Sequence, residues 1–159
     1  MNAPFMDLTT NKKRHAESLL NSAAAIFAAE MDSMEAIQDL EELAPWFKAQ
    51  IGFKEMEHFA AVFLDHGKRV VGRVVFPEGS KTRTVLFPRK LFKAGLEAEA
   101  TMIVLAHNHP SGTTMPSPQD RELTRRVQQI GESLEVNLAD HFIVTPKGEH
   151  ISFKKHGWM

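Results

Sequence analysis

The 159-residue sequence has no cysteine and no tyrosine, and none of its apolar runs approaches the length of a membrane span. The absence of cysteine excludes disulfides and every metal site that uses thiolate ligands, so histidines and carboxylates must hold any metal. A membrane-spanning helix needs about 20 consecutive apolar residues, which excludes a membrane protein of that kind. The N-terminus has no apolar stretch after a basic start. We therefore expect no secretory signal and a cytoplasmic protein.

The composition that remains is ordinary for a globular domain, with 43% hydrophobic and 25% charged residues. The net charge is only -1, but residues 30–57 carry eight acids against Lys48 and Lys54. Residues 66–93 carry eight bases against Glu78. Such segments are usually solvated faces. The alternative is a basic patch for an acidic partner, with DNA as one candidate, which the lack of tyrosine and of interleaved aromatics disfavours.

Hydrophobic spacing divides the chain into three parts. The parts are a flexible tail over residues 1–10, an N-terminal helical segment over residues 11–52, and a main domain over residues 53–159. In the helical segment, residues 11–31 have the apolar stripe of a helix. Ser33 is placed to cap a second helix, which Pro45 breaks or restarts.

The main domain alternates short apolar runs with two helical patterns. Strands are predicted at residues 57–64, 69–76, 82–87, 101–106, 140–145 and 150–153, and helices at residues 88–100 and 117–131, with Gly131 stopping the second helix. After the helical segment, the order βββαβαββ predicts an α/β (α+β) fold in which helices flank a mixed β-sheet.

The stretch HNHPSGTTMPSPQD, residues 107–120, concentrates polar groups after the buried run at residues 101–106. His107 and His109 stand two residues apart, so on extended backbone both imidazoles point to one face, as a shared metal ion requires. A single histidine at such a place is usually structural. A pair at the end of a buried strand is less often structural, so a shared metal site is one candidate role, although the pair alone does not decide it.

Ser117 and Asp120 have two compatible interpretations. Ser-x-x-Asp followed by a helical pattern is typical of a capping box, and Pro118 suits the first helical position. An aspartate in that first turn can also present its carboxylate to His107 and His109. The three side chains would then form a catalytic zinc site, which keeps three protein ligands and leaves the fourth position to water.

A hydrolytic site also needs a general base, and the residues alone leave this choice open. Glu55 and Glu57 both precede the first predicted strand, and Glu57 lies nearer to its apolar run. Another reading treats the metal as a structural staple. That closed site would need a fourth protein ligand, for which His141 is the nearest candidate.

One spacing in the sequence is characteristic of a known family. Glu57 is followed by H-x-H-x7-S-x-x-D, which comprises His107, His109, Ser117 and Asp120. This pattern resembles the JAMM motif of MPN+ (JAB) metalloproteases. The form HNHPSG…PS..D…T, completed by Thr124, resembles RadC-like proteins, and the likeness extends over roughly residues 55–153. It implies an MPN/JAB (cytidine-deaminase-like) architecture for residues 53–159.

The resemblance also implies a function. His107, His109 and Asp120 would bind Zn²⁺ in a metallohydrolase that cuts peptide or isopeptide bonds of a peptide or protein substrate. Glu57, preferred over Glu55 because its distance to Phe59 fits the family pattern, would take a proton from the attacking water. Ser117 would hydrogen-bond the water or the oxyanion.

The sequence departs from longer RadC-like proteins, which carry a further helical region with a helix-hairpin-helix flavour. The residues before Glu57 contain no glycine-bearing hairpin suited to a DNA backbone, while Ser80 and Lys90 replace the family's usual threonine and glutamate. The alternative function is a DNA-repair-associated or mobile-element binding protein with a metal site but little turnover. For Asp140-His141, also a family feature, we expect a structural role.

Overall fold

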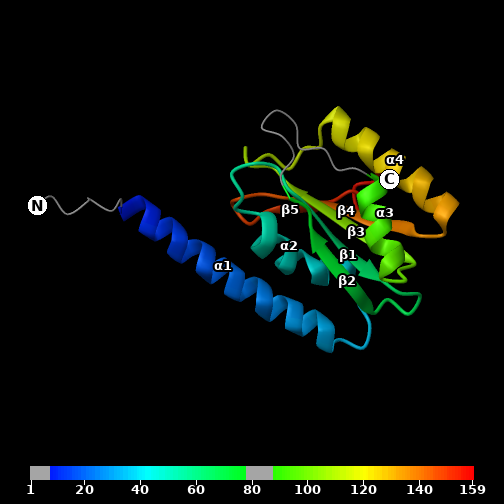
Figure 1. The fold of residues 1–159 in the computed structure, drawn as a ribbon. Coiled ribbons are helices and arrows are strands. Elements are labelled where there is room, and N and C mark those ends of the chain that lie inside the picture. Colours follow the sequence, from blue (N-terminus) through cyan, green and yellow to red (C-terminus); the bar gives the residue numbers. More distant parts are fainter. Residues whose placement is uncertain (1–7, 78–87) are drawn as a thin grey trace, which may run out of the picture.

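A computed structural model describes residues 8–77 and 88–159. Its elements are α1 (Leu8–Ser33), the 3-10 helix η1 (Leu40–Leu43), α2 (Ala44–Ile51), β1 (Phe59–Leu64), β2 (Val70–Val75), α3 (Pro88–Glu97), β3 (Met102–Asn108), α4 (Pro118–Leu134), β4 (Asn137–Val144) and β5 (His150–Ser152). Helices α1 and α2 lie on one side of the sheet, and α3 and α4 lie on the other (Figure 1). Within these residues, no helix combines the length and apolarity needed to cross a bilayer.

The described strands form one mixed sheet in the order β2-β1-β3-β4-β5, which confirms the predicted fold class. Only β3 and β4 pair in parallel, while the other neighbours are antiparallel. Parallel neighbours need a crossover, which α4 provides between β3 and β4. The strand predicted at residues 82–87 lies outside the described residues.

Both faces of the sheet are covered, which explains why β1 is an uninterrupted apolar run. Val62 and Leu64 belong to the core under α1 and α2, whereas Ala61 and Phe63 belong to the core under α3 and α4. The helical segment is thus part of a shared core. Phe47 of α2 is fully buried in this core, and its ring centroid lies 6.0 Å from that of Phe142 on β4.

The helical segment differs from the prediction at its caps. Helix α1 starts at Leu8 and includes Ser33, whose hydroxyl donates to the carbonyl of Glu30 instead of capping a second helix. Asp39 caps η1 instead, in a reciprocal capping box with Glu42. Asp-x-x-Glu is the stronger start signal because both side chains satisfy free backbone N–H groups.

Gly131 does not stop α4, contrary to the prediction. The helix runs to Leu134 and ends at Glu135, which has a left-handed φ of 56°. A Cβ at position 131 would lie 2.4 Å from the carbonyl oxygen of Val136, and the Val136 N–H donates to the Gly131 carbonyl. Glycine is therefore needed for the close return of the chain toward β4, and not for a turn.

Glu41 on η1 joins the helical segment to the C-terminal hairpin through His150 and Lys155. Burial raises the pKa of the Glu41 carboxyl, but hydrogen bonds from His150 and Lys155 outweigh it and lower the pKa below 4.5. A carboxyl whose pKa is lower in the folded protein than in the unfolded chain stabilises the fold at a pH above its unfolded pKa. This stabilisation is lost as the pH falls through the folded pKa.

We therefore expect Glu41→Gln to lower the free energy of unfolding by about 1 kcal/mol at pH 7. The difference from wild type should shrink toward zero once pH falls below 4.5. Urea unfolding of both proteins across this range measures it, with Glu149→Gln, on an exposed residue of the same hairpin, as the control. A difference independent of pH would contradict the role of the Glu41 charge.

Candidate metal centre

The C-terminal end of β3 brings two histidines together. His107 is a fully buried residue of β3, and His109 follows directly after the strand with 6% exposure. Because alternate residues of a strand share a face, both rings turn the same way. Their Nε2 atoms lie 2.9 Å apart, so the two imidazoles converge on one point.

The first turn of α4 adds a carboxylate. Ser117 and Asp120 form the predicted capping box, since the Ser117 hydroxyl accepts from the Asp120 N–H and the Asp120 carboxylate accepts from the Ser117 N–H. The same carboxylate approaches both histidines, with Oδ1 at 3.3 Å from His107 Nε2 and Oδ2 at 3.3 Å from His109 Nε2. Capping and metal-ligand geometry therefore coexist in one side chain.

These three side chains are the metal-ligand group that the described residues contain. One ligand atom from each lies within 4.8 Å of the others, and all three residues are buried. Two neutral imidazole nitrogens and a carboxylate form an electron-rich cage, which a cation stabilises. The residues thus fit a metal ion such as zinc, which accepts nitrogen and oxygen ligands.

A chain of hydrogen bonds behind His107 sets the position of its proton. The Thr124 hydroxyl donates to the Asp120 carbonyl at 2.7 Å, so it can only accept from His141 Nδ1, also at 2.7 Å. Burial, followed by the charge of His107, holds the pKa of His141 well below its usual value, so this ring is neutral. His141 Nε2 then accepts from His107 Nδ1 at 2.8 Å, which leaves the Nε2 lone pair of His107 for a metal.

His109 is oriented in the same way by the loop. Its Nδ1 donates to the carbonyl of Thr113 at 2.9 Å, so Nε2 faces Asp120. Burial lowers the pKa of His109, but the hydrogen bond with Asp120, the Thr113 carbonyl and the charge of Glu57 together raise it. Burial raises the pKa of Asp120, yet His107 and His109, which can donate to this carboxylate when their Nε2 atoms are protonated, hold it far below its usual range. The carboxylate therefore stays ionised at every pH where the protein would work. A metal ion bound by the three side chains would displace those Nε2 protons.

His141 is not a fourth ligand. Its Nε2 faces Nδ1 of His107, the ring nitrogen that points away from the cage, and the ring stacks on Phe153 with centroids 4.6 Å apart. This position removes the closed-site reading of a structural metal. The predicted structural role of Asp140-His141 takes a specific form, since His141 orients a ligand and Asp140 accepts from Ser152 and the Lys154 N–H.

Thr124→Val tests the hydrogen-bond chain, because valine keeps the shape and loses the hydroxyl. We expect zinc affinity to fall about 10- to 100-fold, the usual effect of removing a group that orients a ligand. Isothermal titration with zinc measures the affinity. Thr124→Ser retains the hydroxyl and should bind zinc nearly as wild type does; equal losses in both variants would assign the effect to packing alone.

Asn108, between the two histidines, was quoted in the motif but given no role from sequence. Its side chain points to the opposite face, where the carbonyl accepts from the His58 N–H at 2.6 Å. Its amide donates to the carbonyls of Lys54 and Met56, each at 3.1 Å. Asn108 thereby connects the segment that contains Glu57 to β3, the strand that carries His107. The sequence signal for this role is strand alternation, which turns Asn108 away from the face that His107 and His109 share.

The two candidate bases lie in different surroundings. Glu57 is half-buried just before β1, and its charge contributes to the raised pKa of His109. Glu55 is exposed and forms an ion pair with Lys13 on α1 at 2.6 Å. The ion pair with Lys13 assigns Glu55 to the surface, and Glu57 remains the candidate base.

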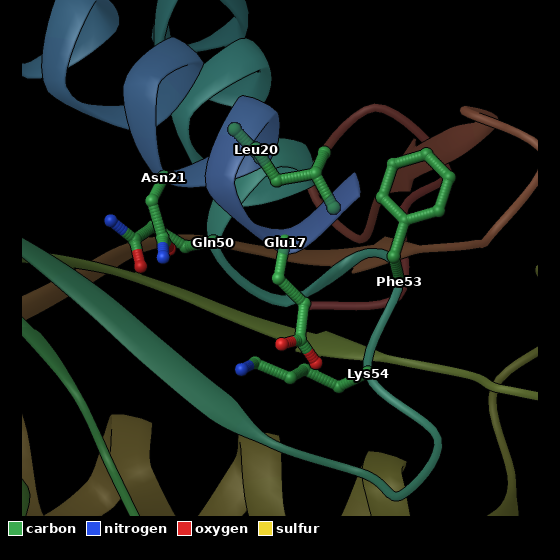
Figure 2. Close-up of a pocket in the computed structure, with 7 residues that line it drawn as sticks. Glu17, Leu20, Asn21, Gln50, Phe53 and Lys54 are labelled. Carbon is green, nitrogen blue, oxygen red and sulfur yellow. The ribbon is translucent and has the colours of Figure 1, made fainter. Parts of the chain in front are cut away.

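A pocket lies beside this segment, between α1 and the end of α2 (Figure 2). Its lining comprises Glu17, Leu20, Asn21, Ala49, Gln50, Phe53 and Lys54. The side chains of Leu20 and Phe53 project into it from opposite segments (Figure 2). None of the three metal-ligand residues lines it, so this pocket and the metal centre are separate places on the molecule.

Comparison with known proteins agrees with the geometry. A family model described as "RadC-like JAB domain" matches residues 37–158. A UPF0758 protein of Aromatoleum aromaticum is 32% identical over 143 residues, which cover 90% of this chain and 64% of the relative. Another UPF0758 protein, from Pseudomonas fluorescens, is 34% identical over 90% of this chain and 63% of its own. The chain thus spans less than two thirds of the length of these relatives.

Proposed function

Because this chain belongs to the family of RadC-like JAB domains, we propose that it is a zinc-dependent metallohydrolase of the JAMM class that cuts peptide or isopeptide bonds. The observation that carries the proposal is the buried convergence of His107, His109 and Asp120 within 4.8 Å. Three protein ligands, with no fourth among the described residues, are typical of catalytic zinc sites, whereas structural sites are closed by four.

When bound by these residues, zinc supplies Lewis acidity to the scissile carbonyl and to the attacking water. His107 and His109 contribute neutral nitrogen ligands, since their Nδ1 protons are committed to His141 and Thr113. Asp120 contributes the negative charge. The proton positions that metal binding requires are therefore already set by the fold.

Glu57 is the proposed general base and acid. Its carboxylate would take a proton from the attacking water and pass it to the leaving amine, so that one group serves both halves of the reaction. Ser117 is the proposed oxyanion donor. Its oxygen accepts from the Asp120 N–H at 3.1 Å, which leaves the hydroxyl proton for the substrate.

The direct test is cleavage that follows the metal. The purified protein is stripped with a chelator, reloaded with zinc, and assayed against fluorogenic peptides and lysine-linked isopeptides. Activity that disappears with the metal and returns with zinc supports the proposal. Stoichiometric zinc without cleavage of any substrate in either class would overturn the hydrolase and leave a metal-binding domain.

DNA binding, the alternative from sequence, stays a prediction that the structure favours less. Two arginines of the basic segment, residues 66–93, form ion pairs with acidic side chains. Arg73 pairs with Asp32 at 2.6 Å, and Arg69 pairs with Asp65 at 2.9 Å. Paired bases neutralise fewer phosphates. Salt-dependent DNA binding that weakens in Arg69→Ala and Arg73→Ala would restore this alternative.

A further inference from the structure

Helix α1 has two apolar stripes, of which only one is buried. Ala24, Phe27 and Met31 pack into the core beneath α1. The second stripe consists of Leu19, Ala23 and Ile26, at spacings of four and three residues that place them on one face. Leu19 is 59% exposed and Ile26 is 66% exposed. Single exposed leucines are common, whereas here two large exposed side chains share one stripe, with the half-buried Ala23 between them.

The second stripe, here called the outer stripe, is on the solvent side of the helix. Helix α1 crosses the outside of α2, and among the described elements none lies beyond it (Figure 1). Its N-terminal end extends past the body of the protein (Figure 1), and residues 10–19 are all exposed. The pocket formed with Phe53 is on the inner side of α1 and leaves the outer stripe uncovered.

Charges at the two ends of the outer stripe have opposite signs. Lys12 is seven residues before Leu19, and Glu30 is four residues after Ile26, so both exposed side chains continue the same face. The stripe thus reads basic, apolar, acidic from N- to C-terminus. A second copy turned end for end presents acidic, apolar, basic, which is the complement of the first.

We propose that the chain forms a homodimer through antiparallel pairing of the outer stripes of two α1 helices. Leu19 of each copy contacts Ile26 of the other, and Lys12 lies within about one turn of Glu30 of the other. The two-fold axis passes between Ser22 and Ala23, whose small side chains let the helices approach. Such an interface is isologous, so every contact occurs twice. A parallel pair would instead set Lys12 against Lys12 and Glu30 against Glu30.

Sedimentation velocity tests the association. The 17.9 kDa chain is expected to sediment as a dimer at micromolar concentrations, and Leu19→Glu as a monomer with unchanged helix content. The matched control is Leu96→Glu on α3, where leucine is 50% exposed, and it should remain dimeric. A wild-type monomer at 200 µM, or a Leu19→Glu variant that still dimerises, would overturn the proposal.

Charge exchange tests the direction of the pair. Lys12→Glu and Glu30→Lys should each raise the dissociation constant roughly tenfold, because each change occurs twice and replaces attraction with repulsion. The double variant should return to the wild-type value. Failure of the double variant to recover would exclude the antiparallel register.

The lack of native cysteine allows a second, independent measurement of the direction. Ser22→Cys lies next to the two-fold axis and should form an intermolecular disulfide on mild oxidation. Asn21→Cys, on the neighbouring residue of the opposite face, should not. Lys12→Cys would cross-link only in a parallel pair, and its cross-linking would contradict the proposal.

Discussion

Replacing Glu57 with glutamine is expected to reduce turnover about a thousandfold while zinc stays bound, since a positioned acid or base contributes about 10²- to 10⁴-fold. Glutamine has the size of glutamate and can hydrogen-bond water, but it cannot take the proton. None of the three residues of the cage changes, so zinc content should remain near one per chain. Cleavage rate and elemental analysis on the same sample separate the two effects.

Glu55→Gln is the matched control for this substitution. Its carboxylate pairs with Lys13 on the surface, so turnover should stay close to wild type. If Glu57→Gln retained full activity, Glu57 would lose the role of base. If Glu55→Gln were the inactive variant, the base would have been assigned to the wrong carboxylate of the pair.

The second large effect is expected from His109→Ala, which removes one nitrogen of the cage. Zinc affinity should fall by two to three orders of magnitude, and protein purified without chelator should contain almost no zinc. Asp120→Asn should also lose zinc, yet its amide oxygen can still accept from the Ser117 N–H, so α4 keeps its cap. Zinc titration calorimetry and thermal unfolding without metal distinguish lost affinity from lost structure.

His150→Ala is the control for these two variants, because this histidine of β5 pairs with Glu41 on η1 and is not one of the three metal-ligand residues. It should bind zinc as wild type does. Unchanged zinc content in His109→Ala would remove His109 from the ligand set. Loss of zinc in His150→Ala as well would indicate that the metal is held nonspecifically by histidines.

The ligand residues could be predicted from sequence because they depend on local geometry. Strand alternation places His107 with His109, and a capping box fixes Asp120 one turn into α4, so short-range rules were enough. The continuous apolar runs at β1 and β3 likewise indicated buried central strands. These features require no knowledge of distant parts of the chain.

The features that sequence did not predict depend on contacts between distant segments. The relay from Thr124 through His141 to His107 joins α4, β4 and β3, and its spacing has no regular period. Gly131 was assigned to a helix stop because glycine has that local meaning, whereas its role is set by the carbonyl of Val136. The ion pair of Arg73 with Asp32 spans 41 residues.

The connection between β3 and β4, the parallel pair of the described sheet, has a consequence for how the site assembles. All three metal-ligand residues fall within residues 107–120, so bringing them together orders one short loop. The entropy cost of closing a loop grows with the logarithm of the loop length, and a short loop therefore costs little. The hydrogen bond from His58 to Asn108, which holds the segment of Glu57, joins positions 50 residues apart. The three ligand side chains therefore come from one local β3–loop–α4 unit, although His141 on β4 orients one of them, while the proposed reaction centre also needs the segment of Glu57 before β1. Displacement of the segment before β1 that carries Glu57 would leave a chain that still binds zinc but is expected not to turn over substrate.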